Sequence, residues 1–211
     1  MPLVLRWYSG KSTIVLRPAA DLAILGAVIG DGFGKLLAAA QHGSEDAFTA
    51  LWLDGNSALL RYLRVIAPDA AEDIAAETWV QVVRKLASFR GDEAAWRAWL
   101  FTTARRRVID QARRRARRPE TPLGDIPAAR LPVTADTADI ALEQLATASA
   151  LALLAGLPSL QAEVILLRVV AGLDTSAVAR IVGCSQGAVR VAAHRGLRRL
   201  ARQLAEAGVT L

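Results

Sequence analysis

Apolar residues recur every three or four positions along most of the chain, which is the spacing of the buried face of an amphipathic helix. Glycines, prolines and short polar residues interrupt this pattern where helices are expected to begin or end. The expected helices cover about 48–66, 69–86, 92–118, 145–154, 161–170, 174–182 and 185–204. No stretch of useful length alternates apolar and polar residues with the period of two that strands require. The pattern therefore predicts an all-α fold.

The stretch between residues 119 and 140 lacks this periodicity and holds four of the chain's eight prolines. Such a composition is typical of a linker with little regular structure. It divides the helices into two small domains, one over 34–118 and one over 141–211. Residues 1–33 carry no motif. We interpret them either as an extension outside the main fold or as the result of a translation start assigned too far upstream.

Basic residues outnumber acidic ones by 26 to 20 in this chain of 211 residues, and all but three of the basic residues are arginines. They gather in two clusters, with eight arginines between 105 and 118 and six between 180 and 202. The stretch from 35 to 95 instead holds nine acids against six bases. Because the guanidinium fork suits phosphates and guanine edges, we expect separate surfaces with separate partners, nucleic acid among them.

Composition also excludes several classes of protein. An apolar share of 53% excludes a disordered chain. A single cysteine and two histidines argue against a disulfide framework, a multi-cysteine zinc site and a conventional metal or acid–base centre. We therefore expect no metal, no cofactor and no catalytic residue. The most apolar stretch, 19–30, is shorter than the roughly 18 to 20 residues of a membrane span, and the first residues do not form a signal peptide, so the expected location is the cytoplasm.

The strongest local signal lies between residues 157 and 204. A helix ending at Gly172 is followed by a short helix capped by Asp174 or Thr175, a tight turn at Gly183-Cys184-Ser185 and a long basic helix. This order is typical of a helix-turn-helix reader, whose second helix fits the major groove of DNA. An ordinary helical hairpin with a solvated arginine face is the alternative, and the absence of balancing acids favours DNA binding.

A second signal combines aromatic residues and arginines between residues 92 and 118. Aromatic faces stack on unpaired bases while arginines hold phosphates, so the combination suits a DNA strand that has been opened. The alternative is that the aromatic side chains pack the core. We favour core packing for Trp99 and leave both roles open for Trp96.

With these motifs in place, the chain resembles the bacterial RNA polymerase sigma factors of the extracytoplasmic-function (ECF) group, in the sigma-70 superfamily. The resemblance covers about residues 34–204. It is carried by GSEDAFTALW, DAAEDIAAETWVQVVRKLASFRG, WRAWLFTTARRRVID and LPSLQAEVILLRVVAGLDTSAVARIVGCSQGAVR, in the family's order and with a linker in the family's place. It implies a second sigma domain over 34–118 and a fourth sigma domain, with the helix-turn-helix, over 141–211.

The resemblance also implies three binding surfaces. The segment that docks on the coiled coil of the polymerase's largest subunit has Glu72, Asp73, Glu77 and Thr78 at its motif. The region of the minus-ten element, including the pocket for a flipped base, corresponds to Phe89, Trp96, Thr103, Arg105, Arg106, Arg107, Arg113 and Arg114. The residues toward the minus-thirty-five element are Ser185, Gln186, Arg190, His194, Arg195 and Arg198. The implied partners are core RNA polymerase, promoter DNA and an anti-sigma protein.

The chain departs from the family's pattern at four positions. Ala76 stands where glutamine is frequent, Arg106 where asparagine is common, and Val191 and Ala192 where a serine and a basic residue are usual. These departures are expected to alter one docking hydrogen bond, the preferred flipped base and the anchoring at the minus-thirty-five element.

Two other functions compete with this interpretation. A freestanding transcriptional regulator would explain the helix-turn-helix but not the Trp96–Arg118 segment or the acidic docking helix. A nuclease would use a magnesium ion gathered by Asp69, Glu72, Asp73 and Glu77, although docking or surface carboxylates are the favoured interpretation. Cys184 is interpreted as a small packing residue rather than a redox centre.

Overall fold

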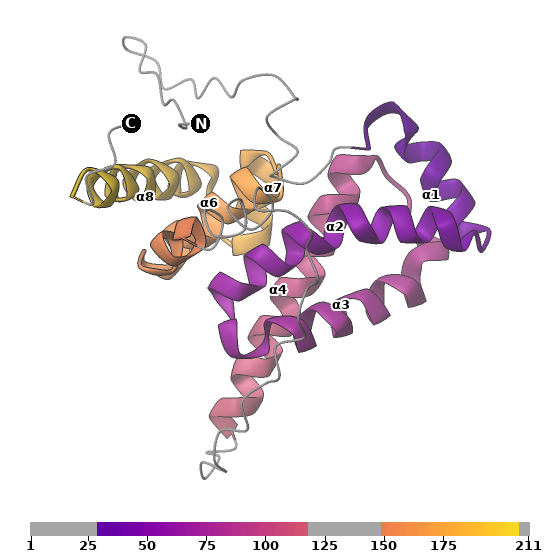
Figure 1. The fold of residues 1–211 in the computed structure, drawn as a ribbon, viewed down its shortest axis with the longest axis horizontal. Coiled ribbons are helices and arrows are strands. Elements are labelled where there is room, and N and C mark those ends of the chain that lie inside the picture. Colours follow the sequence, from indigo (N-terminus) through magenta and orange to yellow (C-terminus); the bar gives the residue numbers. More distant parts are fainter. Residues whose placement is uncertain (1–28, 118–148, 207–211) are drawn as a thin grey trace, which may run out of the picture.

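The computed structural model describes residues 29–117 and 149–206, and all regular structure within these ranges is helical (Figure 1). The all-α prediction is therefore confirmed. In chain order the elements are η2 Gly30–Gly32, α1 Phe33–Gln41, α2 Glu45–Ile66, η3 Pro68–Ala70, α3 Ala71–Lys85, η4 Leu86–Ser88, α4 Glu93–Arg117, α6 Ser159–Ile165, the π-helical η5 Leu166–Val170, α7 Thr175–Val182 and α8 Gln186–Glu206. Residues 149–155 are also helical. The predicted linker, 119–140, lies outside the described residues.

The helices of the first domain begin where polar side chains cap them. Ser44 accepts a hydrogen bond from the backbone N–H of Ala47 (3.3 Å) and starts α2, and Asp92 accepts one from Ala95 (2.8 Å) and starts α4. Each cap satisfies a backbone donor that the first helical turn leaves unpaired. Gly91 precedes the second cap with φ +154°, and a Cβ there would lie 2.8 Å from the Cβ of Ala95. Only glycine therefore fits this turn.

The core of the first domain lies between α2, α3 and α4. Leu59, Tyr62 and Leu63 of α2 and Trp96 of α4 are fully buried, with 0% of their surface exposed. Two large apolar residues of the predicted helices are exposed instead of buried, since Trp52 is 37% exposed and Val83 is 54% exposed. The helical period places them at the edge of the buried face, where neighbouring helices do not cover them.

The packed structure starts earlier than the predicted domain boundary at residue 34. The backbone N–H groups of Ile29 and Gly30 donate to the two carboxylate oxygens of Glu93, at 3.2 and 2.9 Å. Phe33 is buried, and its ring centre lies 6.2 Å from that of Trp96. Residues 29–33 therefore pack against α4, whereas residues 1–28 lie outside the described part of the chain.

The second domain contains a π-helical turn and two glycine-dependent turns. After α6, the backbone N–H of Ala171 donates to the carbonyl of Leu166 (3.0 Å), which closes a five-residue step. Gly172 (φ +65°) and Gly183 (φ +75°) then adopt left-handed conformations that glycine tolerates best. Of the two predicted caps of α7, Asp174 and Thr175, the structure shows Asp174, whose carboxylate accepts from the backbone N–H of Ala177 at 2.7 Å.

The recognition-type helix α8 crosses α6 closely at Gly196. A Cβ at this position would lie 2.6 Å from Cδ1 of Ile165 and 3.2 Å from Cβ of Gln161. We expect Gly196→Val to lower the free energy of unfolding by about 1–3 kcal/mol through overpacking, measured by urea denaturation. Gly187→Val is the matched control on the same helix, because a Cβ there meets only the Ser185 hydroxyl at 3.8 Å. Equal denaturation midpoints for the two variants would contradict the prediction.

Candidate nucleic-acid interface

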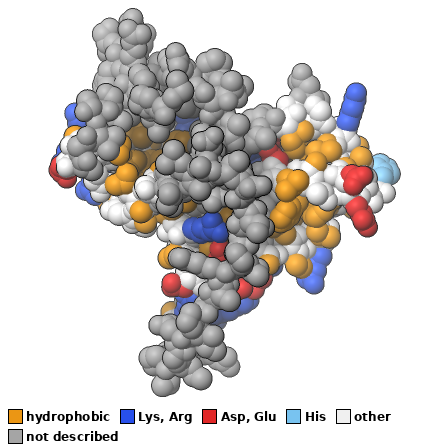
Figure 2. Space-filling model, in the orientation of Figure 1, with side chains coloured by type: hydrophobic (Ala, Val, Ile, Leu, Met, Phe, Trp, Pro, Cys, Tyr) orange, Lys and Arg blue, Asp and Glu red, His pale blue; other side chains and the backbone are white. Residues whose placement is uncertain are grey.

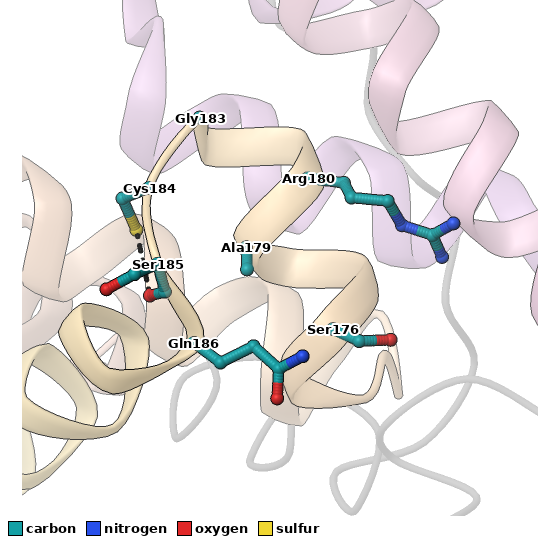
Figure 3. A pocket seen from close by; sticks show the side chains of 7 residues that line it. All are labelled: Ser176, Ala179, Arg180, Gly183, Cys184, Ser185 and Gln186. Atoms are coloured by element: carbon teal, nitrogen blue, oxygen red, sulfur yellow. Dashed lines mark hydrogen bonds between the residues drawn. The ribbon is translucent and has the colours of Figure 1, made fainter.

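The helix-turn-helix opens a hollow at its turn. The hollow has a volume of about 650 Å³ and is lined by Ser176, Ala179, Arg180, Gly183, Cys184, Ser185 and Gln186. Figure 3 shows the Gln186 side chain extending below the turn toward α7, whereas the side chains of Ser176 and Arg180 point away from the turn. Polar groups from α7 and from the start of α8 therefore line one open surface. Cys184 is half-buried, and its thiol lies 3.6 Å from the carbonyl of Ser185.

All six residues predicted to face the minus-thirty-five element are exposed, and five of them lie on α8. These residues are Ser185, Gln186, Arg190, His194, Arg195 and Arg198. The Ser185 hydroxyl accepts from the backbone of Ala188 at 3.1 Å and so caps α8. Helix N-termini of this kind attract phosphates. Val189, Ala192 and Gly196 form the inward face of the same helix.

The two departures on α8 have different structural consequences. Ala192 is only 6% exposed and packs in the core, so a long side chain has no room to reach DNA from this position. Val191 is 49% exposed and presents an apolar side chain on the surface of the recognition-type helix. The first departure is thus a packing feature, whereas the second changes the chemistry of the exposed face.

The residues predicted to face the minus-ten element do not all reach the surface. Arg106, Arg113 and Arg114 are exposed, and Phe89 is half-buried with its ring stacked on Trp99 at 5.0 Å. The prediction that Trp96 and Thr103 face DNA is wrong. Trp96 is fully buried between aromatic rings, and Thr103 is 9% exposed with its hydroxyl donating to the carbonyl of Trp99 at 2.8 Å. Both belong to the core, because their positions on α4 face the neighbouring helices.

Two further members of the same set form ion pairs. Arg105 donates to Glu163 at 2.7 Å, and Arg107 lies 3.4 Å from Glu77 and 3.5 Å from Gln81. The second pair joins a residue of the minus-ten set to one of the polymerase-binding set. The two predicted surfaces therefore adjoin between α3 and α4.

On α3, three of the four predicted polymerase-binding residues are exposed. Glu72, Asp73 and Glu77 lie on the surface. The prediction of Thr78 as a surface residue is wrong, because Thr78 is fully buried and its hydroxyl donates to the carbonyl of Ile74 at 2.7 Å. The helical period turns position 78 toward the core together with Ile74 and Trp79.

Exposed apolar residues, which the motifs did not predict, lie on the same helix as these acids and on α2. Val80 is 51% exposed and Val83 is 54% exposed on α3, while Trp52 and Leu53 are exposed on α2. Figure 2 shows hydrophobic side chains gathered on the visible face of the first domain, over α1 and α2. The spacing of Ala76, Val80 and Val83 could have predicted this apolar patch, because these positions lie on the helix face that also carries the acids. Exposed apolar residues beside charges are typical of protein-binding surfaces.

The sequence motifs also did not predict a buried ionic cluster in the first domain. Arg97 of α4 lies 3.0 Å from both Asp54 of α2 and Glu93 of its own helix, and Asp54 is only 8% exposed. Burial raises the pKa of the Asp54 carboxyl, while the charge of Arg97 opposes that increase. The cluster joins α2, α4 and the backbone at Ile29 and Gly30. Its role is to hold helices together.

Three of the four acids of the hypothetical magnesium site, all except Asp73, lie beside arginines. Asp69 lies 3.7 Å from Arg115, Glu72 lies 3.2 Å from Arg64, and Glu77 pairs with Arg107. No group of three histidines, cysteines or acids within 29–117 and 149–206 is arranged to hold a metal ion.

Two family models match the sequence in chain order. Sigma-70 region 2 matches residues 57–118, and Sigma-70 region 4 matches residues 147–200. The ECF RNA polymerase sigma factor ShbA of Streptomyces griseus is 34% identical over 184 residues, covering 82% of this chain and 95% of ShbA. The chain belongs to the ECF sigma factors of the sigma-70 family. The freestanding-regulator alternative is set aside, because region 2 accounts for the segment that it left unexplained.

Other ECF sigma factors match over part of their length. BldN of Streptomyces coelicolor is 33% identical over 172 residues, or 81% of this chain and 65% of BldN. SigD of Mycobacterium tuberculosis is 34% identical over 139 residues, or 66% of this chain and 65% of SigD. The chain thus spans just under two thirds of these two relatives.

Solved structures show the same fold. CnrH, in complex with the cytosolic domain of CnrY, is 23% identical with a TM-score of 0.55, covering 83% of this chain and 99% of CnrH. The sigma factor RpoE of Bartonella quintana, in complex with the anti-sigma factor NepR, is 24% identical with a TM-score of 0.53, covering 74% of this chain and 96% of RpoE. Within the described ranges, no helix of the ECF sigma factor is both long and apolar enough to span a membrane.

Proposed function

We propose that this ECF sigma factor binds core RNA polymerase in the cytoplasm, directs it to specific promoters and assists the opening of the DNA strands. The main support for the proposal is that regions 2 and 4 match in order on one chain. The exposed polar face of α8 lies within region 4. Nucleotide addition is left to the polymerase, and the sigma factor contributes binding energy and orientation.

Promoter recognition is divided between the two domains. The exposed residues of α8 read the minus-thirty-five element in the major groove, with Arg190 reaching base edges and Arg198 the phosphates. In the first domain, Arg106, Arg113 and Arg114 hold the backbone of the opened minus-ten strand. The partly exposed ring of Phe89, stacked on Trp99, offers an aromatic surface for an unpaired base.

The segment between the domains limits what the free chain can do. The predicted linker, residues 119 to 140, lies outside the described residues, and a free coil of 22 residues averages about 25 Å end to end. Promoter elements about 17 base pairs apart, as in the family, are separated by roughly 60 Å. We therefore expect core polymerase to hold this segment extended, and the isolated chain to bind promoters poorly.

The exposed acids and valines of α3 form the proposed docking surface for polymerase. An apolar centre beside charged groups suits a protein partner, since the apolar area supplies affinity and the charges supply orientation. An anti-sigma protein is proposed to cover the same surface and thereby block docking. RpoE of Bartonella quintana is an example of a similar fold bound to an anti-sigma factor.

Run-off transcription with core polymerase and a library of randomised promoters tests the proposed function. We expect RNA from a subset of templates that share two sequence elements, and no RNA without the sigma factor. A gel-shift measurement with the isolated chain is expected to show only weak binding to the selected promoters. Failure to initiate from every template would contradict the proposal, and nanomolar sequence-specific binding by the isolated chain would contradict the role of polymerase.

Charge reversal on α3 tests the docking surface. Asp73→Arg is expected to weaken binding to core polymerase about 5- to 30-fold, because it places a cation where the partner meets an acid. Binding is measured by fluorescence anisotropy with the labelled full chain. Asp46→Arg is the matched control, since Asp46 is also an exposed acid in the first turn of a helix, α2. Equal affinities for the two variants would place the docking surface elsewhere.

A further inference from the structure

The two domains meet at a buried glutamate. Glu163 of α6 is 9% exposed, and its Oε1 accepts a hydrogen bond from the hydroxyl of Tyr62 at 2.9 Å and another from Nε of Arg105 at 2.7 Å. Tyr62 lies on α2 and Arg105 on α4, so both donors come from the first domain. A carboxylate withdrawn from water remains charged only where such partners compensate it.

Arg105 contacts the second domain at two elements. Its Nη2 also donates to the backbone carbonyl of Val182 at 3.4 Å, at the end of α7. Carbonyls in the last turn of a helix carry partial negative charge and favour a cation. A single guanidinium thus joins α4 to both α6 and α7.

Apolar packing surrounds these polar contacts. α2 lies against α6 and the π-helical η5, and α4 lies against α7, as Figure 1 shows. Val65 of α2 packs against the cluster of Leu157, Ala162 and Ile165 in the second domain. The fully buried ring of Tyr62 meets Phe101 edge to face, with ring centres 5.4 Å apart. The hydroxyl of Tyr62 is therefore held at the surface that faces Glu163.

This arrangement conflicts with promoter binding in two respects. The Arg105 side chain, a member of the minus-ten set, is 25% exposed and has its charge neutralised by Glu163. In addition, α7 of the minus-thirty-five reader lies against α4 of the minus-ten reader. Two readers in contact do not span elements separated by roughly 60 Å.

We propose that the Glu163 contact with Tyr62 and Arg105 is autoinhibitory: it holds the two domains together in the free chain and withholds Arg105 from DNA until polymerase separates them. The inference rests on the proposed function, because the inhibited activity is promoter recognition with polymerase. Glu163 lies outside every set of residues assigned to DNA or polymerase.

Spin-label distances in the full chain test the closed state. Nitroxides are placed at Ser57→Cys and Ala152→Cys, both exposed positions, in a Cys184→Ser background. The parent chain is expected to give one short, narrow distance distribution. Glu163→Gln removes the charge and retains the shape, and we expect it to raise the ratio of long to short distances about tenfold. Glu206→Gln, which removes an exposed acid from the same domain, should leave the distribution unchanged.

A functional measurement accompanies the distances. In run-off transcription, Glu163→Gln should reduce the concentration of chain that half-saturates core polymerase about fivefold, and Glu206→Gln should not. An unchanged distance distribution or an unchanged half-saturating concentration for Glu163→Gln would overturn the inference. If Glu163→Gln loses its helical circular dichroism, Tyr62→Phe decides the question in the same assays, because it removes only the hydroxyl. Absence of RNA with the parent chain would instead overturn the proposed function, whatever the distances are.

Discussion

Replacing Arg97 by methionine is expected to lower the free energy of unfolding by about 3–5 kcal/mol. Arg97 lies 3.0 Å from Asp54 and from Glu93, and the Arg97 and Asp54 side chains are only 10% and 4% exposed. Methionine fills much of the same volume but leaves two carboxylates without a compensating charge, and removing one partner of a buried pair has a cost of this size. Urea denaturation at neutral pH measures the change.

The pH dependence of this effect identifies its cause. Burial already raises the pKa of Asp54, so protonation of this carboxyl favours the folded state, and its stabilising effect is present at low pH and lost as the pH rises. Without Arg97 the pKa of Asp54 should rise further. The difference in stability between Arg97→Met and the parent is therefore expected to narrow as the pH is lowered from neutrality.

Two variants control for the loss of a side chain as such. Arg64→Met breaks an ion pair with Glu72 in which the side chains are 55% and 67% exposed, and it should change stability by less than about 1 kcal/mol. Adding Asp54→Asn to Arg97→Met should recover at least about 1 kcal/mol relative to the sum of the single changes. If Arg97→Met lowers the free energy of unfolding as little as Arg64→Met does, the cluster does not stabilise the fold.

Trp96→Ala is expected to lower the free energy of unfolding by about 3–5 kcal/mol. Trp96 is fully buried, and its ring centre lies within 6.2 Å of Phe33 and within 5.5 Å of Phe89 and Trp99. Truncation removes the common neighbour of three aromatic rings and leaves a cavity at the centre of the first domain. Circular dichroism during urea denaturation reports the loss.

Trp96→Phe separates packing from hydrogen bonding. Within the described residues, the indole N–H of Trp96 has no hydrogen-bond partner, so phenylalanine loses volume but no hydrogen bond. We expect it to cost less than half as much as Trp96→Ala. Trp52→Ala, at a position 37% exposed, should cost less than either. An unchanged free energy of unfolding for Trp96→Ala would contradict the proposed role of Trp96 in the core.

Part of this picture was available from the amino-acid order. Helical spacing predicted α2, α3 and α4, a helix start at Asp92 or Glu93, another at Asp174 or Thr175, and a turn at Gly183. The structure has caps at Asp92 and Asp174 and ends α7 at Gly183, and such ends are predictable because capping depends on contacts between near neighbours. The exposed face of α8 was predictable for the same reason, since one helical period separates its inward and outward residues. Thr78 and Trp96 were misplaced because the motif alone does not say which neighbour covers a helix face.

The order of residues along this chain thus determined its all-helical character, the place of the helix-turn-helix and the family to which it belongs. Only the tertiary structure decided that Arg97 compensates Asp54, that residues 29–33 pack on α4, and that Glu163 joins Tyr62 and Arg105. These pairs are 43 to 101 positions apart in the chain. Local propensity acts over one or two helical turns, whereas a contact at such a separation exists only once the helices have packed.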